Sequence, residues 1–230
     1  SLETMKKMMA EAKPETIIVI SGHHSFLTDH FIINLHPEYK GDFQEFSDLT
    51  TELFFKADVT LINRIRDFVE DKAPLTLKSE ENLEYGVLAP LYYLAEGLSE
   101  VKIVPISYAL LDSKTHFHFG ELLKEVIHDS SKRIAVIASG DMSHTLTKDA
   151  PGGYSKKAKQ YDQSVIKMLK EKDIEGIFNI EDTLLEEVRE CSLRSIVTLL
   201  GILKNIPYRT EILSYEHPFG VGYLTAQFRV

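Results

Sequence analysis

The stretch Ile17-Ile18-Val19-Ile20-Ser21-Gly22-His23-His24 decides the fold class of this chain. It is a run of β-branched apolar residues that stops abruptly at two histidines. Two further runs do the same: residues 134–144, IAVIASGDMSH, reach an aspartate and a histidine, and residues 211–223, EILSYEHPFGVGY, reach a glutamate. Such runs are typical of buried parallel strands, and ligands bind beyond the carboxyl ends of the strands in open α/β sheets. We therefore expect two imidazoles and a carboxylate to converge at that edge.

Outward from these runs, strand patterns alternate with helix patterns. Residues 56–71, for example, carry apolar side chains at the spacing of a helix packed on one face. The predicted helices are 2–12, 56–71, 87–95, 119–128, 155–171, 183–188 and 193–203, and the predicted strands are 16–21, 101–107, 133–138, 209–215 and 222–228. The alternation favours an α/β fold. We expect three layers, with a mainly parallel or mixed central sheet and helices on both faces.

Two segments depart from this alternation. Residues 29–54 contain short β-like pieces around a turn at residues 39–42, and we expect them to lie over the sheet edge. The two closing strands flank Pro218-Phe219-Gly220, which predicts that they pair as a hairpin-like end to the sheet.

Length and charge limit the class of protein. A chain of 230 residues that is 43% hydrophobic can bury roughly 70 to 75% of its unfolded surface, enough for one sizeable core. We find no linker or internal repeat, so we expect a single domain over residues 1–230. The 26 basic and 35 acidic residues give a net charge of −9, which argues against a nucleic-acid partner because phosphate binding needs a concentrated positive field.

Cysteine content and hydropathy bear on location. The single cysteine, Cys191, excludes an internal disulfide and a cysteine-rich zinc site and is typical of the reducing cytosol, so we expect a cytoplasmic protein. The longest strongly apolar stretch, residues 196–203, is too short to cross a bilayer, and we expect no membrane partner. Residues 2–12 resemble the middle of an amphipathic helix at the very start of the chain, and we expect that a segment upstream of them is missing.

His23 and His24 end the first strand. As adjacent histidines in a loop they are consistent with ordinary polar residues. A rigid buried strand, however, gives a loop side chain low positional entropy, which suits a metal ligand. Because neighbouring side chains point in different directions, we expect only one of the two to face a given metal.

The segment Gly140-Asp141-Met142-Ser143-His144 is more specific. Asp141 and Ser143 are residues that commonly cap turns or bond to the backbone. His144 ends a strand beside a glycine and titrates near neutrality, which favours a general acid/base role. Direct metal binding by His144 stays open as the alternative.

Glu216 supplies a carboxylate where the chain must turn before Pro218. By itself it is consistent with a solvated turn residue. Together with two strand-end histidines it becomes a candidate oxygen ligand, since two histidines and one carboxylate with open positions are typical of Fe(II) enzymes that handle dioxygen.

Other residues have simpler interpretations. His116 and His118 precede the predicted helix 119–128, and we place them in the loop that leads into it rather than in a metal pair. Cys191 fits a half-buried structural thiol better than a nucleophile, because nothing local in the sequence lowers its pKa.

Six segments taken together resemble a known family. They are residues 20–23 (ISGH), 83–91 (LEYGVLAPL), 138–144 (ASGDMSH), 149–155 (DAPGGYS), 190–195 (ECSLRS) and 214–223 (SYEHPFGVGY). In this order they resemble the LigB-type catalytic subunit of class III extradiol ring-cleavage dioxygenases, most closely the microbial branch related to Memo proteins. The resemblance covers nearly the whole chain.

The resemblance implies a mononuclear Fe(II) held by two histidines and a glutamate, with another divalent metal as an alternative. On that basis His23 matches one histidine ligand, Glu216 the carboxylate ligand and His144 the acid/base residue. The implied substrates are a small aromatic molecule and O2, and the family's habit of associating leads us to expect a homodimer.

The chain departs from the family pattern in two places. The family's other histidine ligand lies on a strand before the first helix, where no residue of this chain matches it; His24 is a weak substitute. The family often has Asp-His-Gly where this chain has Glu84-Tyr85-Gly86, so a tyrosine replaces a histidine that faces the substrate. Tyr85 can donate a hydrogen bond but cannot shuttle a proton near pH 7. We expect Tyr85 in the substrate pocket, and we expect His24, Asp141 and His217 there with it.

Two rival functions remain. The missing ligand and Tyr85 favour a non-catalytic, Memo-like metal-binding or regulatory module. A metal-dependent hydrolase needs only a bound water and a base, which Glu216 and His144 could supply.

Overall fold

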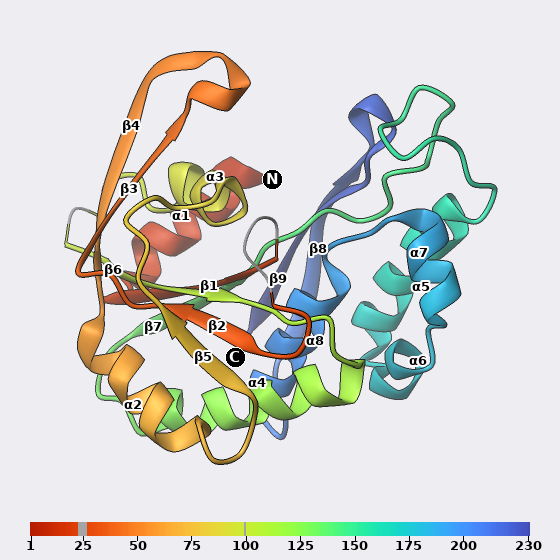
Figure 1. Ribbon diagram of the computed structural model, residues 1–230. Helices are drawn as coiled ribbons and strands as arrows, with labels where there is room; N and C mark the ends of the chain where they lie inside the picture. The colour runs from red at the N-terminus through yellow and green to blue at the C-terminus, as the bar shows by residue number, and fades with distance from the viewer. Residues whose placement is uncertain (23–26, 99) are drawn as a thin grey trace.

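The computed structural model describes residues 1–22, 27–98 and 100–230 (Figure 1). The helices are α1 (Leu2–Ala12), α2 (Val59–Val69), α3 (Tyr85–Leu94), α4 (Ser113–His128), α5 (Ala158–Glu171), α6 (Ile174–Phe178), α7 (Asp182–Val188) and α8 (Leu193–Ile202), with short 3-10 turns η1 (Gln44–Phe46) and η2 (Pro218–Gly220). The strands are β1 (Thr16–Ser21), β2 (Phe31–Asn34), β3 (Glu38–Phe43), β4 (Asp48–Ala57), β5 (Leu75–Lys78), β6 (Lys102–Ser107), β7 (Ile134–Ala138), β8 (Arg209–Glu216) and β9 (Tyr223–Arg229).

A seven-stranded mixed sheet forms the middle layer. β1 lies at its centre and runs parallel to β6 and to β7, with Thr16 opposite Lys102 on one side and Ile134 on the other. Helices α2, α4 and α8 lie on one face of this sheet, and α1 and α3 lie on the other (Figure 1). The predicted three-layer α/β fold is confirmed, because the continuous apolar residues of β1 and β6 are buried on both faces.

The outer edge of β6 changes partner halfway along. Its first residues pair in parallel with the end of β4, at Lys102 and Ile103, and its last residues pair with antiparallel β2, at Ile106 and Ser107. Pro105 lies between the two pairings. The amides of Lys102 and Tyr108 bond towards β1, whereas the carbonyl of Ile103 bonds outwards. Because successive residues of a strand point their backbone groups to opposite sides, the nitrogen of Pro105, which has no hydrogen to donate, faces the outer edge. It lies between the pairings with β4 and β2, where no hydrogen bond between strands is needed.

Three local predictions are wrong. The turn predicted at residues 39–42 lies inside β3, and the register between β3 and β4 instead shifts at Asp42 and Phe43. The strands β8 and β9 do pair, but they form a separate two-stranded sheet, because Leu224 and Phe228 pack into a second apolar cluster under α5 and α8. Strand β5 and helix α6 lie where no element was predicted.

His116 and His118 lie on α4 rather than in a loop before it, which corrects a fourth prediction. The helix begins at Ser113 because the Asp112 side chain accepts a hydrogen bond of 2.7 Å from the amide of Thr115. His116 is fully buried, and burial lowers the pKa of its imidazole to about 4.

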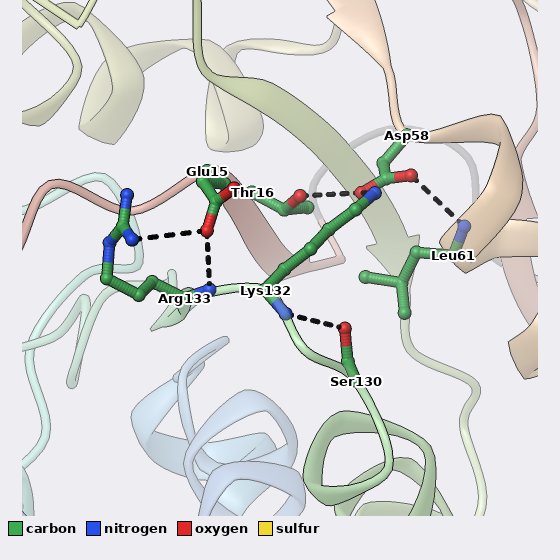
Figure 2. A network of polar contacts seen from close by, with 7 residues as sticks. All are labelled: Glu15, Thr16, Asp58, Leu61, Ser130, Lys132 and Arg133. Carbon is green, nitrogen blue, oxygen red and sulfur yellow. Dashed lines mark hydrogen bonds and ion pairs between the residues drawn. The ribbon is translucent and has the colours of Figure 1, made fainter.

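A buried ion pair closes the amino ends of the parallel strands (Figure 2). Asp58 is 1% exposed and accepts hydrogen bonds of 2.6 Å from Lys132 Nζ and from Thr16 Oγ1, and one of 3.1 Å from the amide of Leu61 at the start of α2. Burial opposes ionisation of Asp58, but these hydrogen bonds outweigh it and hold the pKa of the carboxyl below its ordinary value. This network lies at the opposite end of β1 from the strand ends that carry His144.

Among the described helices, none has the length and apolar character that crossing a bilayer requires.

Candidate metal and substrate site

The carboxyl ends of β1, β6 and β7 meet at one edge of the sheet, as predicted from their parallel pairing. Tyr108 follows β6 and connects the end of β1 to the segment around Cys191. Its ring lies so close to Gly22, after β1, that a Cβ on Gly22 would lie 2.0 Å from the Tyr108 Cζ atom. Its hydroxyl donates a hydrogen bond of 3.0 Å to the carbonyl of Cys191. Gly22 is therefore required by packing, and the segment around Cys191 is tied to the strand ends.

Asp141, His144 and Cys191 form the one group of potential metal ligands in the described part of the chain. One ligand atom of each residue lies within 4.8 Å of the others. The Nε2 atom of His144 is 3.3 Å from Oδ2 of Asp141, and these side chains are 22% and 26% exposed. The group is thus partly shielded from water yet accessible from the sheet edge.

The backbone holds this group in place. The amide of Asp141 donates to Sγ of Cys191 at 3.1 Å, and the amide of Cys191 donates to the carbonyl of Asp141 at 3.0 Å. Gly140 precedes Asp141, and a Cβ there would lie 2.6 Å from the Cys191 carbonyl oxygen. The close approach of the two segments therefore depends on glycine at position 140.

Asp162 of α5 anchors the loop from behind. This buried carboxylate accepts hydrogen bonds from the amide and hydroxyl of Ser143, at 3.0 and 2.9 Å, and from the hydroxyl of Tyr215 on β8. Burial raises the pKa of Asp162 and outweighs these bonds. The loop that carries His144 is thereby fixed to the two-stranded sheet as well as to β7.

Electrostatics set the proton states of the group. The hydrogen bond with Asp141 raises the pKa of His144 and outweighs burial, which lowers it. Burial raises the pKa of the Cys191 thiol to about 12. Burial, followed by the charge of Asp141, also raises the pKa of Tyr85 to about 12. Near neutral pH the site therefore contains a readily protonated imidazole, a neutral thiol and a neutral phenol.

Tyr85 begins α3, and the next residue, Gly86, accepts a hydrogen bond of 2.6 Å at its carbonyl from the hydroxyl of Ser139, just after β7. The start of α3 is thus tied to the strand end that leads to Asp141 and His144. After burial, the charges of Asp141 and Cys191 contribute to the raised pKa of Tyr85 and of Tyr223. Tyr85 lines a cavity whose lining, among the described residues, does not include Asp141, so the expectation that the two share a substrate pocket stays a prediction.

Glu216 ends β8 directly opposite Tyr223, and directly opposed residues in an antiparallel pair share one face of the sheet. Glu216 and Tyr223 thus lie on the same face of the two-stranded sheet. The Glu216 side chain is exposed and is not part of the three-residue group. His217 is exposed, with its ring 6.1 Å from that of Tyr215. His23 and His24 lie outside the described residues. The ligand roles of His23 and Glu216 stay predictions.

Sequence reasoning missed the position of Cys191. Its burial agrees with the predicted structural thiol, yet its sulfur lies beside Asp141 and His144. The contact joins residues 50 positions apart, which no periodicity reveals. The available signal was the segment 190–195, one of the six that carry the family resemblance.

The donor set fits a metal ion. Imidazole nitrogen, carboxylate oxygen and thiol sulfur are together ligands of divalent transition metals rather than of Mg²⁺ or Ca²⁺. The Nε2 atom of His144 faces Asp141, and a hydrogen bond with the backbone of Arg189 also favours the charged form of the imidazole. The fit to a metal therefore rests on the three donor types within 4.8 Å of one another.

Comparisons with known proteins agree with this chemistry. Residues 1–226 match the family described as the catalytic LigB subunit of aromatic ring-opening dioxygenase. The chain is 30% identical over 233 residues to Protein CA_C1420 of Clostridium acetobutylicum, an alignment covering 97% of this chain and 50% of that protein. It is 28% identical over 185 residues to the MEMO1 family protein PF1638 of Pyrococcus furiosus, covering 76% of this chain and 60% of the relative.

The chain thus spans about half to three fifths of the length of these curated relatives. Among solved structures, the crystal structure of uncharacterized protein JW3007 from Escherichia coli K12 is similar, with a TM-score of 0.69 and 17% identity over 98% of this chain and 91% of that one. At this identity the likeness shows the fold alone.

Proposed function

Because this chain belongs to the LigB family of catalytic subunits of aromatic ring-opening dioxygenases, we propose that it opens a catechol-type aromatic ring with O2 by extradiol cleavage. The observation that carries the proposal is the His144–Asp141 pair at the carboxyl ends of the parallel strands, beside Cys191 and Tyr85. Cleavage of a diol requires a base that accepts a proton from a substrate hydroxyl, and an accessible imidazole at the sheet edge can supply it.

The proposed metal is Fe(II), with His23 and Glu216 as ligands and a further histidine supplied by a strand before α1. Another divalent metal with the same ligand preferences is the alternative. When bound, the metal would supply open coordination positions and the redox chemistry that joins O2 to the aromatic ring. The thiol of Cys191 lies close enough to His144 to take part in binding.

The side chains of the chain itself move and hold protons. The Nε2 atom of His144 faces Oδ2 of Asp141 at 3.3 Å, and this contact raises the proton affinity of the imidazole. It can therefore accept a proton from a substrate hydroxyl and return it later. Tyr85 remains a neutral phenol and can donate a hydrogen bond that orients the substrate, but it does not transfer a proton.

Oxygen uptake by the full-length protein tests the proposal. The protein is loaded with Fe(II) without oxygen and then mixed with air-saturated buffer and a panel of catechols. We expect one O2 consumed per catechol, strong loss of uptake in His144→Ala, and weakened iron binding in Glu216→Gln. The control is Glu211→Gln, an exposed carboxylate on the same strand as Glu216. Stoichiometric iron binding with no uptake for any catechol would refute the dioxygenase function.

A second candidate, a metal-binding module without ring-opening activity, is favoured by one specific observation. A thiol lies in the ligand group, and curated relatives carry the name MEMO1 family. Under this function, Co(II) bound to the protein should show a thiolate-to-metal absorption band that disappears in Cys191→Ser, with no oxygen uptake. The predicted homodimer and the predicted cytoplasmic location stay proposals, tested by light scattering and by cell fractionation.

A further inference from the structure

The β3–β4 hairpin extends from the edge of the seven-stranded sheet, on the side of α3 (Figure 1). Backbone hydrogen bonds fix it there: the amide of Lys40 donates to the carbonyl of Glu81 at 3.0 Å, and the amide of Leu83 donates to the carbonyl of Lys40 at 2.8 Å. A Cβ on Gly41 would lie 2.6 Å from Cδ1 of Leu88, so β3 packs directly on the helix that begins with Tyr85. The hairpin therefore has a defined position relative to the candidate site.

Polar contacts order the tip of the hairpin. The Asp48 carboxylate accepts hydrogen bonds from both the amide and the hydroxyl of Thr50 and of Thr51, at 2.6 to 3.1 Å. Across the tip, the amide of Gln44 donates to Oδ1 of Asp42 at 3.0 Å. The 3-10 turn η1 is thus held at both ends, and Phe46 is its last residue.

Phe46 contacts Tyr85 from this position. Their ring centroids are 5.5 Å apart with an angle of 74° between the planes, an edge-to-face contact. Phe46 nevertheless remains 57% exposed. The residue after Tyr85, Gly86, accepts a hydrogen bond of 2.6 Å at its carbonyl from the hydroxyl of Ser139, which follows β7 and precedes the loop of Asp141 and His144. Phe46 therefore contacts the helix start that is tied to this strand end, and it keeps much of its surface open.

A cavity of about 260 Å³ lies beneath the tip. Its lining includes Glu45 from the turn, Tyr85 from α3 and Ser107 from the carboxyl end of β6. The hairpin tip, the helix start and the sheet edge thus border one space, whose lining also includes the charged residues Asp42, Lys78 and Glu80. Phe46 is not among the described lining residues and reaches this space through its ring contact with Tyr85.

We propose that the tip of the β3–β4 hairpin forms the outer wall of the substrate site and that Phe46 contacts the aromatic ring of the substrate as a specificity-determining residue. Phe46 has no group that binds metal or transfers a proton, so its contribution is apolar area and the quadrupole of its ring. Both favour a planar aromatic ligand held against the Phe46–Tyr85 pair. This inference rests on the proposed function for the identity of the substrate class.

The absence of tryptophan from the chain allows a direct test. Phe46→Trp places a fluorophore at the proposed wall, and its signal is read as the difference from the unmodified protein. Phe54→Trp places one on β4 of the same hairpin, at a side chain that is 70% exposed. Each full-length, Fe(II)-loaded variant is titrated without oxygen with catechol and with 4-nitrocatechol. We expect saturable quenching at position 46 and only the linear, non-saturable effect of free ligand at position 54.

Kinetics provide the second readout. Phe46→Ala should raise KM for catechol by about tenfold and change kcat by less than about threefold, because the residue contributes binding area rather than chemistry. Phe46→Leu should fall between Phe46→Ala and the unmodified protein, and Phe54→Ala should change neither parameter.

The outcomes separate the two proposals. Saturable quenching at position 46 without oxygen uptake would support the hairpin wall and refute ring opening. Oxygen uptake with no response at position 46 and unchanged kinetics in Phe46→Ala would refute the hairpin wall alone. No uptake together with no response at position 46 would refute both.

Discussion

The imidazole Nε2 of His144 lies 3.3 Å from the Oδ2 atom of Asp141, and this contact holds the pKa of the imidazole above its ordinary value. The two residues lie in one loop, three positions apart, and hydrogen bonds fix this loop to α5, to Gly222 just before β9 and to the Cys191 segment. The pair is therefore preorganised, and its proton state responds directly to changes at position 141.

Asp141→Asn should lower the pKa of His144, because the main hydrogen bond to the charged imidazole is lost while the smaller influences of the Arg189 backbone and of Glu190 remain. Titration of the His144 ring protons by NMR measures the change. Asp149→Asn, an exposed aspartate in the same loop region, is the control. An unchanged titration in Asp141→Asn would show that burial, not the pair, sets the proton affinity.

The same pair predicts a pH dependence of stability. A raised pKa in the folded state means that the stabilisation is complete below the ordinary histidine pKa and disappears as the pH rises through the folded-state value. Asp141→Asn should therefore reduce the free energy of unfolding by about 0.5 to 1 kcal/mol at pH 5.5, and much less at pH 9. Urea unfolding at both pH values measures the difference; an equal loss at both would contradict it.

Cys191 should react slowly with alkylating reagents in the folded, metal-free protein. With a pKa of about 12, only about one thiol in ten thousand is ionised at pH 8, compared with roughly a quarter for an ordinary cysteine. Because the chain has one cysteine, whole-protein mass spectrometry follows iodoacetamide labelling without ambiguity. We expect labelling at least about a hundredfold slower than in denaturant. Equal rates in the two conditions would show that the thiol is accessible and normally acidic.

Gly22→Ala should destabilise the protein by about 1 to 3 kcal/mol, since the new methyl group overlaps the Tyr108 ring. Tyr108→Phe, which removes only the hydrogen bond to the Cys191 carbonyl, should cost about 0.5 to 1.5 kcal/mol. If overlap with the ring is the cause, Gly22→Ala should cost clearly less in a Tyr108→Ala background. A double-mutant cycle by urea unfolding measures this coupling, and a coupling of zero would contradict the explanation.

Asp58→Ala should reduce the free energy of unfolding by about 3 to 5 kcal/mol, because it removes a buried carboxylate that pairs with Lys132, Thr16 and the first turn of α2. Glu15→Ala is the matched control in the same region (Figure 2), since its pair with Arg133 is largely exposed and should contribute at most about 1 kcal/mol. Oxygen uptake should survive in both variants at temperatures where they are folded. Equal destabilisation by the two changes would mean that burial does not strengthen the Asp58 contacts.

The layer architecture could be predicted from the sequence because its signals are local. The apolar runs of β1, β6 and β7 are continuous, and the apolar spacing in α2 is that of a helix packed on one face. The hairpin was harder, since Gly41 and Asp42 are typical turn residues, whereas here Gly41 lies in a strand because it packs on Leu88. Likewise, the alternation in Thr115-His116-Phe117-His118 concealed a helix that begins earlier through its Asp112 cap.

Some residues of the candidate site also have local sequence signals, and others do not. His144, Asp141 and Tyr85 belong to short segments that follow or precede predicted elements, so the sequence indicated them. Cys191 and Phe46 enter through contacts between distant segments: a backbone pairing with Asp141 and an edge-to-face contact with Tyr85. No periodicity in one chain encodes such contacts.

The change of partner at Pro105 has an evolutionary consequence. The hairpin that carries Phe46 joins β6 through only two residue pairs, Lys56 with Lys102 and Ala57 with Ile103. Insertions or deletions beyond that junction would leave the ladders of β1 with β6 and β7 intact. The hairpin that carries Phe46 can therefore tolerate changes in length while the sheet edge that carries Asp141 and His144 keeps its geometry.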